Sequence, residues 1–201
     1  MVARNRVYDF GKRLIDIFVS SIAFVITAPL QALIFLIVRF TLGRPVFFRQ
    51  RRPGKNGVIF EMIKFRTMRE ATNNLTTDAE RLTKIGKILR ASSLDELPTL
   101  WNVLKGDMSL VGPRPLLESY LEKYSDEQAR RHEVKPGVTG LAQVRGRNSI
   151  TWDERLVLDV EYVDRRSLKL DFKILIETIK VIIKKDGITH QDHATMPLFK
   201  E

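Results

Sequence analysis

Apolar residues are unevenly distributed along this chain, and one uninterrupted run of them dominates its first quarter. Residues 17–38 carry no charged side chain, and a helix of about 20 apolar residues is long enough to span a bilayer. Pro29 stands near the middle of the run, where proline removes a backbone hydrogen bond and clashes with the preceding turn. Each half is then about 18 Å long, too short to cross about 30 Å of hydrocarbon. The pattern predicts a membrane-embedded helix with a kink or break at Pro29.

Positive charges flank this run on both sides. Arg4, Arg6, Lys12 and Arg13 precede it, and Arg39, Arg44, Arg49, Arg51 and Arg52 follow it. A spanning helix would export one of these clusters, against the positive-inside tendency. The charges therefore favour a re-entrant helix–break–helix over a span, and a helix that is apolar all round does not fit a one-sided core helix. We expect residues 1–43 to form this membrane-embedded part and residues 44–201 a catalytic domain on the cytoplasmic face of the inner membrane.

Beyond residue 43 the pattern alternates between short β-rich runs and longer helical spacings. A β-hairpin is predicted from residues 46–48 and 58–65, which enclose a turn with Pro-Gly and Asn-Gly signals. Helical spacing predicts helices over 79–89, 94–104, 116–133, 152–165 and 171–185, with Gly106 closing the second and Gly187 capping the last. The last has a broad apolar face, which suits either core packing or the membrane interface. The fold class expected is mainly α with a small β-hairpin (α+β): a re-entrant membrane helix and interfacial amphipathic helices around a compact catalytic domain.

Composition narrows the chemistry only partly. The 201 residues include 34 Lys and Arg against 24 Asp and Glu, a net charge of +10. This excess suits nucleic acid, anionic lipid or a phosphorylated substrate, and no aromatic residues are interleaved in a basic face to favour nucleic acid. The absence of cysteine excludes disulfides and thiolate metal sites. The three histidines lack zinc-site spacing, and neither a phosphate-loop nor a dinucleotide-binding motif is present.

Two adjacent acids, Asp95 and Glu96, are the candidate reactive groups. Ser93 and Glu96 fit the S-x-x-E capping box, in which the two side chains satisfy the first backbone N–H groups of a helix. A carboxylate at a helix N-terminus is also stabilised as the anion and can serve as a nucleophile or metal ligand. Neighbouring helical positions diverge by about 100°, so we expect the two acids to have different roles. A structural cap and a catalytic pair both remain open on this pattern.

Several cations are candidate phosphate ligands. Arg114 lies between Pro113 and Pro115, which restrict the backbone on both sides, although a loop arginine can equally cap a helix. Arg147 belongs to an R-G-R-N turn after a glycine-rich stretch, and Lys64 lies near the end of the predicted hairpin. Either of these can also be plain surface charge.

Read in order, several motifs of the chain resemble those of bacterial sugar transferases, the monotopic phosphoglycosyl transferases. The resemblance extends from Lys12 to about Gly187, nearly the whole chain. The short length is most similar to the small bacillosamine-type enzymes. The motifs are K-R-L-I-D-I at 12–17, R-P-G at 52–54, K-F-R-T-M at 64–68, S-L-D-E-L-P at 93–98, N-V-L-K-G-D-M-S at 102–109, G-P-R-P at 112–115 and P-G-V-T-G-L-A-Q-V-R-G-R-N at 136–148.

The resemblance implies a reaction and roles for the candidate residues. A sugar-1-phosphate would pass from a UDP-sugar to polyprenol (undecaprenyl) phosphate with release of UMP; the resemblance favours an N-acetylated amino sugar and leaves glucose and galactose open. Asp95 would be the nucleophile of a ping-pong cycle, forming a phospho-aspartyl intermediate, and also the Mg²⁺ ligand. Glu96 would act as base or orienting group for the acceptor. Arg114, Arg147 and Arg90 match family positions that are basic or bind phosphate. Such a step begins glycan assembly, for protein glycosylation or for polysaccharide.

One position departs from the family pattern. The family often has Ser-Pro at the helix break, where this chain has Ala28-Pro29. Thr27 is the candidate replacement, because its hydroxyl can bond to a carbonyl one turn back.

Two other classes of function compete with the transferase: a membrane-anchored basic protein that binds anions, and a scaffold without catalysis.

Overall fold

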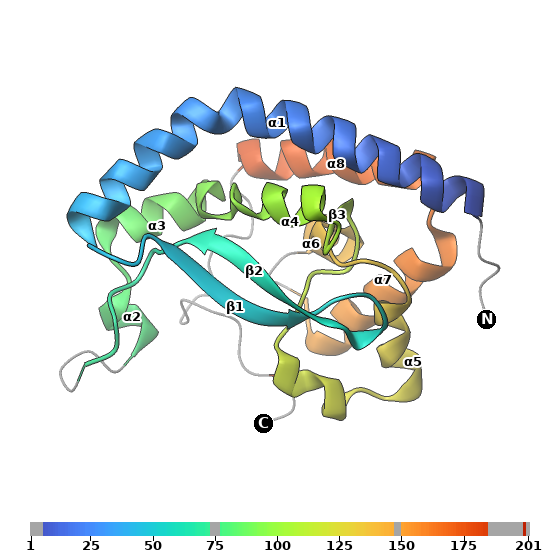
Figure 1. The fold of residues 1–201 in the computed structure, drawn as a ribbon. Helices are drawn as coiled ribbons and strands as arrows, with labels where there is room; N and C mark the ends of the chain where they lie inside the picture. Colours follow the sequence, from blue (N-terminus) through green and yellow to red (C-terminus); the bar gives the residue numbers. More distant parts are fainter. Residues whose placement is uncertain (1–5, 73–76, 147–149, 185–198, 200–201) are drawn as a thin grey trace.

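A computed structural model describes residues 6–72, 77–146, 150–184 and 199. The N-terminal helix α1 (Arg6–Thr41) lies along one side of the domain that the other described elements form, with α8 (Leu168–Lys184) beside it (Figure 1). Below α1 lie α4 (Thr99–Lys105) and an antiparallel hairpin of β1 (Phe47–Pro53) and β2 (Ile59–Phe65). The expected fold class, mainly α with a small β-hairpin, is confirmed.

Helix α1 continues without interruption through Pro29 and bends along its length (Figure 1). Close to the proline, the Thr27 hydroxyl donates to the carbonyl of Ala23 at 2.6 Å, and the Gln31 side-chain amide donates to the same hydroxyl at 3.0 Å. Proline leaves backbone groups in the preceding turn without their usual partners, and hydroxyl bonds of this kind accompany helix bends. Thr27 therefore makes the expected bond, and the predicted kink or break takes the form of a bend within one helix.

Both ends of α1 are fastened to the same domain. Near the start, Arg13 donates to the carbonyls of Val103 and Leu104 at 2.6 and 2.8 Å, and the buried Asp16 accepts the backbone N–H of Leu110 at 3.0 Å. Near the end, Arg66 donates to the carbonyl of Leu42. Capping of the α4 carbonyls by a guanidinium is favourable because they carry partial negative charge. The two halves of α1 thus contact one face of the domain.

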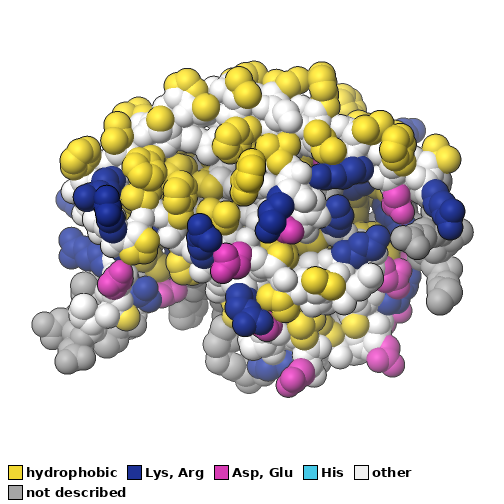
Figure 2. All heavy atoms as spheres, viewed as in Figure 1, with side chains coloured by type: hydrophobic (Ala, Val, Ile, Leu, Met, Phe, Trp, Pro, Cys, Tyr) yellow, Lys and Arg dark blue, Asp and Glu magenta, His cyan; other side chains and the backbone are white. Residues whose placement is uncertain are grey.

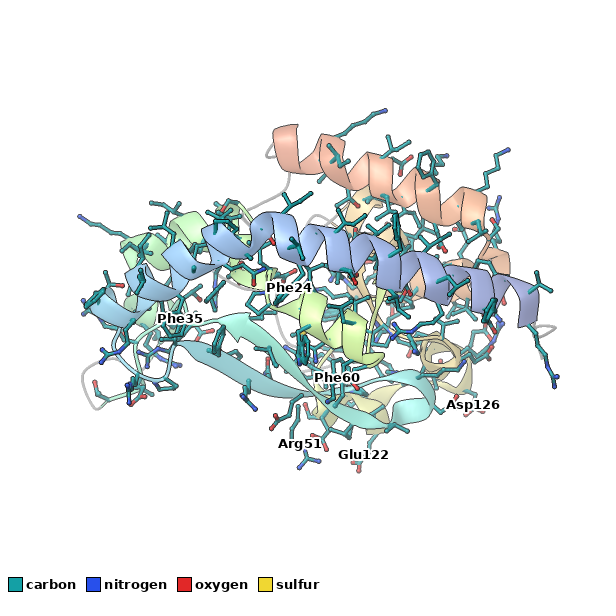
Figure 3. All side chains as sticks on the ribbon, turned by 45° about the horizontal axis from the view of Figure 1, so that its top comes forward. Phe24, Phe35, Arg51, Phe60, Glu122 and Asp126 are labelled. Atoms are coloured by element: carbon teal, nitrogen blue, oxygen red, sulfur yellow. The ribbon has the colours of Figure 1, made fainter. Side chains whose placement is uncertain are left out.

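Aromatic contacts continue this attachment between the two ends. Phe24 and Phe35 lie on the side of α1 that faces the domain (Figure 3). The ring of Phe24 lies 6.5 Å from that of Trp101 in α4, and the ring of Phe35 lies 5.9 Å from that of Phe47 in β1. These separations are in the range of favourable aromatic pairs. The core under α1 is formed by ten buried residues, Phe60, Met62, Leu100, Val103, Met108, Leu110, Val111, Leu141, Tyr162 and Ile174.

The opposite side of α1 is apolar and exposed. Val7, Phe10, Phe18, Ile26 and Phe40 each keep 67% or more of their area exposed. Figure 2 shows hydrophobic side chains along the upper edge of the molecule, with Lys and Arg side chains gathered below them. Among the described residues, α1 is the one helix whose length and apolar character would allow it to cross a membrane. A contiguous apolar surface of this kind marks a site of association with lipid or protein.

The apolar face of α8 is buried along one edge and exposed along the other. Ile174 is fully buried in the core, whereas Phe172 and Ile179 are 66% and 59% exposed. Trp101 of α4 and Ile88 of α3 (Lys84–Ala91) add exposed apolar area. One edge of the face therefore packs in the core, as one alternative predicted, and the other edge belongs to the exposed apolar surface beside α1.

Two predicted helices are divided by local caps. The helix expected over 79–89 consists of α2 (Asp78–Arg81) and α3, because Thr83 turns the chain and accepts the backbone N–H of Gly86 at 2.9 Å. The helix expected over 94–104 is a 3-10 turn, η2 (Leu94–Glu96), followed by α4. Gly106, in the left-handed region at φ 98°, ends α4 as predicted.

The prediction of a single amphipathic helix over 116–133 is wrong. The segment contains η3 (Glu118–Lys123), α5 (Asp126–Ala129) and η4 (Arg130–Glu133). Ser125 and Gln128 form a capping box that starts a new helix in mid-segment. Arg131 then turns inward and pairs with Asp159 at 2.7 Å, both side chains being almost fully buried. This ion pair outweighs the helical spacing.

The remaining elements support the loop that carries Arg114. A short parallel pair joins β3 (Ser109–Val111) to β4 (Gly137–Thr139), followed by α6 (Leu141–Arg145). Helix α7 (Trp152–Arg165) has the predicted bounds and begins with a capping box of Thr151 and Glu154. The predicted helix over 171–185 begins earlier, at Leu168, and its expected glycine cap at 187 lies outside the described residues.

Candidate active site

The two adjacent acids lie in the η2 turn, and the predicted capping box is wrong. Ser93 has a left-handed conformation at φ 57°, and its side chain makes no cap hydrogen bond. An N-cap residue needs an extended backbone for its side chain to reach the first turn, so Ser93 cannot take that part. The Glu96 carboxylate instead accepts Lys64 Nζ at 2.5 Å and Arg114 Nη2 at 2.7 Å. Glu96 is thus an anchor for two cations drawn from separate elements.

Lys64 and Arg114 reach Glu96 from different parts of the fold. Lys64 projects from β2, and Arg114 belongs to the loop that follows β3. The carbonyl of Arg114 accepts Arg131 Nη2 at 2.7 Å, which joins the loop to the buried Arg131–Asp159 pair. The Arg114 and Lys64 charges hold the pKa of Glu96 far below its usual range, although burial acts the other way. Burial lowers the pKa of Lys64, and Glu96 opposes this.

Asp95 has the opposite electrostatic position. Its side chain is buried, with 8% of the residue exposed. Burial, followed by the Glu96 charge, raises the pKa of Asp95 to about 6, whereas Lys64, Arg90 and Arg114 act to lower it. The expected stabilisation of the anion by a helix N-terminus is therefore outweighed here by loss of water. At pH 7 the group is still mainly ionised, because its pKa lies below that pH.

Arg90 reaches the same group of charges from α3. Its Nε donates to the Thr67 hydroxyl at 3.0 Å, which fixes the guanidinium close enough to Asp95 to lower the pKa of that carboxyl. The structure thus brings Asp95, Glu96, Lys64, Arg90 and Arg114 together, as their chemistry suggested. Arg147 lies outside the described residues. An acid that is buried among several cations offers both a nucleophile and a place for phosphate oxygens.

Comparison with known proteins identifies the family. A family described as bacterial sugar transferase matches residues 7–185. The chain belongs to this family. It is 49% identical over 191 residues to an uncharacterized sugar transferase of Bacillus subtilis, covering 94% of this chain and 95% of the relative. It is 39% identical to the UDP-glucose:undecaprenyl-phosphate glucose-1-phosphate transferase of Caulobacter vibrioides, over 89% of this chain and 72% of that protein.

A third relative is longer. The chain is 40% identical to the undecaprenyl-phosphate galactose phosphotransferase of Salmonella typhimurium over 89% of this chain, but this spans only 41% of that protein. The protein is accordingly a transferase. Its long apolar helix and these relatives together indicate a membrane-associated enzyme.

The transferase has two further arginines near Arg114 that the sequence did not single out. Burial, then the nearby Arg114 charge, lowers the pKa of Arg52 to about 10. The same two causes lower the pKa of Arg155 in α7. Arg155 also lies over the Trp152 ring at 5.4 Å. Cations that repel one another in this way are poised for an anion. The sequence contains one indication that Arg155 points inward: its position falls on the inward face of the predicted helix over 152–165.

The site of the transferase has few groups for a metal ion. Among the described residues, no cluster of three or more His, Cys, Asp or Glu side chains is placed to hold one. Magnesium, however, commonly binds through one or two carboxylates plus substrate phosphates and water. Glu96 is already engaged by two cations, whereas Asp95 makes no ion pair within 4.0 Å in the part of the chain that the structure describes. Asp95 alone fits a magnesium ion that reaches the site with a diphosphate substrate.

Proposed function

We propose that this transferase moves a sugar-1-phosphate from a UDP-sugar to polyprenol (undecaprenyl) phosphate, releasing UMP, as the first membrane step of glycoconjugate assembly. The observation that carries the proposal is the buried Asp95, ionised at neutral pH among Lys64, Arg90 and Arg114. A diphosphate donor and a lipid phosphate acceptor both bring negative charge to such a site. The Caulobacter and Salmonella relatives are named for sugar-phosphate transfer to undecaprenyl phosphate.

In the first half of the cycle, an Asp95 oxygen attacks the β-phosphorus of the UDP-sugar. The bond from that phosphorus to the bridging oxygen breaks, UMP leaves with this oxygen, and a sugar-phosphoryl group remains on Asp95. The burial of Asp95 favours the attack because a poorly solvated carboxylate is the more reactive anion. Lys64, Arg90 and Arg114 offset the negative charge that builds up in the transition state.

In the second half, an oxygen of polyprenol phosphate attacks the same phosphorus. The bond to Asp95 breaks, which restores the carboxylate and gives polyprenyl-diphosphate-sugar. A carboxyl leaving group with a pKa of about 6 departs as an anion at neutral pH. Splitting one displacement into two in this way is the logic of nucleophilic catalysis.

Glu96 has the orienting role in this scheme. Its pKa is held far below the usual range, and a carboxylate with so low a pKa is a weak base near pH 7. Its two short bonds, to Lys64 and Arg114, place those cations where the diphosphate must lie. We therefore assign Glu96 to positioning and favour this over proton transfer.

Magnesium is the expected cofactor, with Asp95 as its ligand from the protein. When bound, the ion would neutralise part of the diphosphate charge. Arg114 and Lys64 lie ready to contact the phosphate oxygens that the ion leaves open.

The membrane arrangement that fits best is re-entrant, with the catalytic domain on the cytoplasmic face. A helix of 36 residues is about 54 Å long, yet both ends contact one face of the domain through Arg13 and Arg66. A span would carry one of these ends to the far side of the bilayer. Dipping of the bent middle, around Pro29, into one leaflet keeps both contacts and both basic clusters on one side.

Thiol labelling can test this arrangement, because the chain has no cysteine of its own. Single Arg6→Cys and Thr41→Cys variants are expected to react with an impermeant maleimide in inverted membrane vesicles and not in intact spheroplasts. Labelling of the two positions from opposite sides would refute the re-entrant arrangement.

The activity itself is tested by UMP release from a panel of UDP-sugars with undecaprenyl phosphate and magnesium. The relatives' names favour UDP-glucose and UDP-galactose, and the resemblance to bacillosamine-type enzymes makes N-acetylated amino sugars the contrasting arm. Mass spectrometry after reaction with donor alone should find a sugar-phosphate on Asp95. A chain that releases no UMP with any donor would support the competing anion-binding scaffold.

A further inference from the structure

A cavity of about 300 Å³ lies where α1 ends, apart from the residues assigned to the reaction. Its walls are Thr41, Leu42, Arg44, Arg66, Arg69 and Glu70. Cavities of this volume are large enough for small ligands or head groups. Three of the six lining residues are arginines and one is acidic, so the cavity suits an anion.

Arg66 is the buried member of this wall. Only 7% of the residue is exposed. Its Nη2 donates to the carbonyl of Leu42, and its Nη1 contacts the Glu70 carboxylate at 3.4 Å. The Nε atom is buried and has no hydrogen-bond partner in the part of the chain that the structure describes. Buried polar groups are normally satisfied, so a phosphate oxygen bound at this wall would supply the partner that Nε lacks.

Arg44 and Arg69 supply the other two positive charges of the cavity wall. Within residues 6–72, 77–146 and 150–184, neither guanidinium has an ion-pair or hydrogen-bond partner. The one acid, Glu70, has its side chain 73% exposed, and an exposed pair of this kind contributes little. Planar guanidinium groups bind phosphate through paired hydrogen bonds. The cavity therefore presents three guanidinium groups against a single, well-solvated carboxylate.

The cavity lies between the end of α1 and the end of β2, the strand that carries Lys64. Arg66 follows Lys64 by two residues, a distance of about 7 Å along an extended chain, and adjoins Thr67, whose hydroxyl holds Arg90 at 3.0 Å. On its other side, α1 ends with Leu36 and Phe40 exposed by 49% and 81%. Figure 2 shows the corresponding end of the molecule, where Lys and Arg side chains adjoin the apolar edge.

We propose that Arg44, Arg66 and Arg69 form the arginine cavity that receives the phosphate of the polyprenol acceptor. This rests on the proposed function. The acceptor is a phosphate monoester with close to two negative charges, whereas a bulk phospholipid such as phosphatidylglycerol carries one. Three guanidinium groups discriminate in favour of the dianion, and the exposed end of α1 supplies an apolar surface for the first isoprene units. The phosphate is thereby delivered beside Lys64 and Arg90, within reach of Asp95.

The test uses the full chain and the Arg69→Ala variant, because Arg69 is exposed and its loss leaves the fold intact. Arg165→Ala is the matched control, because Arg165 of α7 is exposed and, among the described residues, pairs only with Glu161 on its own helix. In a ping-pong cycle each substrate has its own kcat/KM. We expect R69A to lower kcat/KM for undecaprenyl phosphate about tenfold, the effect of one charged hydrogen bond, with kcat/KM for the UDP-sugar unchanged. R69K should recover part of the loss.

Three outcomes would count against the arginine cavity as the acceptor site. An acceptor kcat/KM in R69A equal to that of R165A would overturn it, as would an equal loss for donor and acceptor. Repeating the assay in nanodiscs with and without phosphatidylglycerol separates the lipid sources: a loss that appears only with phosphatidylglycerol assigns the cavity to bulk lipid and refutes acceptor binding. Failure of the parent chain to form a phospho-enzyme from donor alone would instead refute the proposed function, independently of R69A.

Discussion

Replacement of Asp95 by asparagine should abolish transfer and at the same time stabilise the fold. Asn has nearly the shape of the protonated acid but cannot ionise. The pKa of Asp95 rises from its ordinary 3.8 to about 6 because the carboxylate is buried beside Glu96. At about 1.4 kcal/mol per pKa unit, keeping this group ionised costs the native state about 3 kcal/mol at neutral pH. The D95N variant is spared this cost, while loss of the nucleophile lowers kcat by about 10⁴-fold or more.

The sign of the pH dependence follows from linkage. The folded pKa lies above the ordinary value, so the native state holds more protons between pH 3.8 and about 6. Wild-type stability therefore falls as pH rises through this window and is level above it. Thermal or denaturant unfolding in detergent should show D95N more stable than wild type at pH 8, with the difference shrinking below pH about 6 and absent near pH 4.

The neighbouring acid, Glu96, provides a matched control, because its substitution should change stability in the opposite direction. Glu96→Gln makes the same chemical change one residue away, but it leaves Lys64 and Arg114 without their shared anion. We expect E96Q to lose about 2–3 kcal/mol of stability at neutral pH. The reasoning about Asp95 is refuted if D95N unfolds more easily than wild type at pH 8, or if its stability difference does not change with pH.

Three further predictions concern the pH profile, the loop support and the bend of α1. The donor kcat/KM should fall about tenfold per pH unit below pH about 6, as Asp95 takes up a proton; a level profile from pH 5 to 8 would contradict an ionised nucleophile. Arg131→Met should cost about 3–5 kcal/mol because Asp159 is left buried and unpaired, and should weaken donor turnover through the Arg114 loop, whereas Arg165→Met, at an arginine with 73% of its side chain exposed, should unfold like wild type. Thr27→Val removes the bonds to Ala23 and Gln31, worth about 1 kcal/mol, so amide exchange around Pro29 should be about fivefold faster, and unchanged exchange would exclude a role for Thr27 in the bend.

Strong local signals account for the parts of the fold that the sequence predicted well. The hairpin turn, the helix end at Gly106 and the bounds of α7, which begins with a capping box, depend on neighbouring residues only. The segment 116–133 failed because its helical spacing competes with two things that spacing does not report. One is the new start at Ser125. The other is the burial of Arg131 against Asp159, 28 residues away.

The candidate site shows the same division. Asp95, Glu96 and Arg114 stood out from their motifs, but the partners of Glu96 come from β2 and from the loop after β3. The false capping box arose because Ser93 and Glu96 have the right spacing, whereas the left-handed backbone at Ser93 has the wrong geometry. Arg52 was missed because its approach to Arg114 depends on how the hairpin packs. Backbone conformation and tertiary proximity are the two quantities that residue spacing does not contain.

The opposite shifts of two adjacent carboxylates explain how the site can hold a reactive anion in a buried place. Glu96 takes the close contacts with Lys64 and Arg114, so its own charge is stabilised and its basicity is lost. The same two cations, with Arg90, act on Asp95 less closely and offset only part of the cost of its burial. A direct ion pair would lower the pKa of Asp95 further and make the carboxylate a poorer nucleophile, while removal of the cations would raise that pKa. Glu96 thus holds the cations at a distance that keeps Asp95 ionised but reactive, which is why the isosteric changes D95N and E96Q should move stability in opposite directions while both impair transfer.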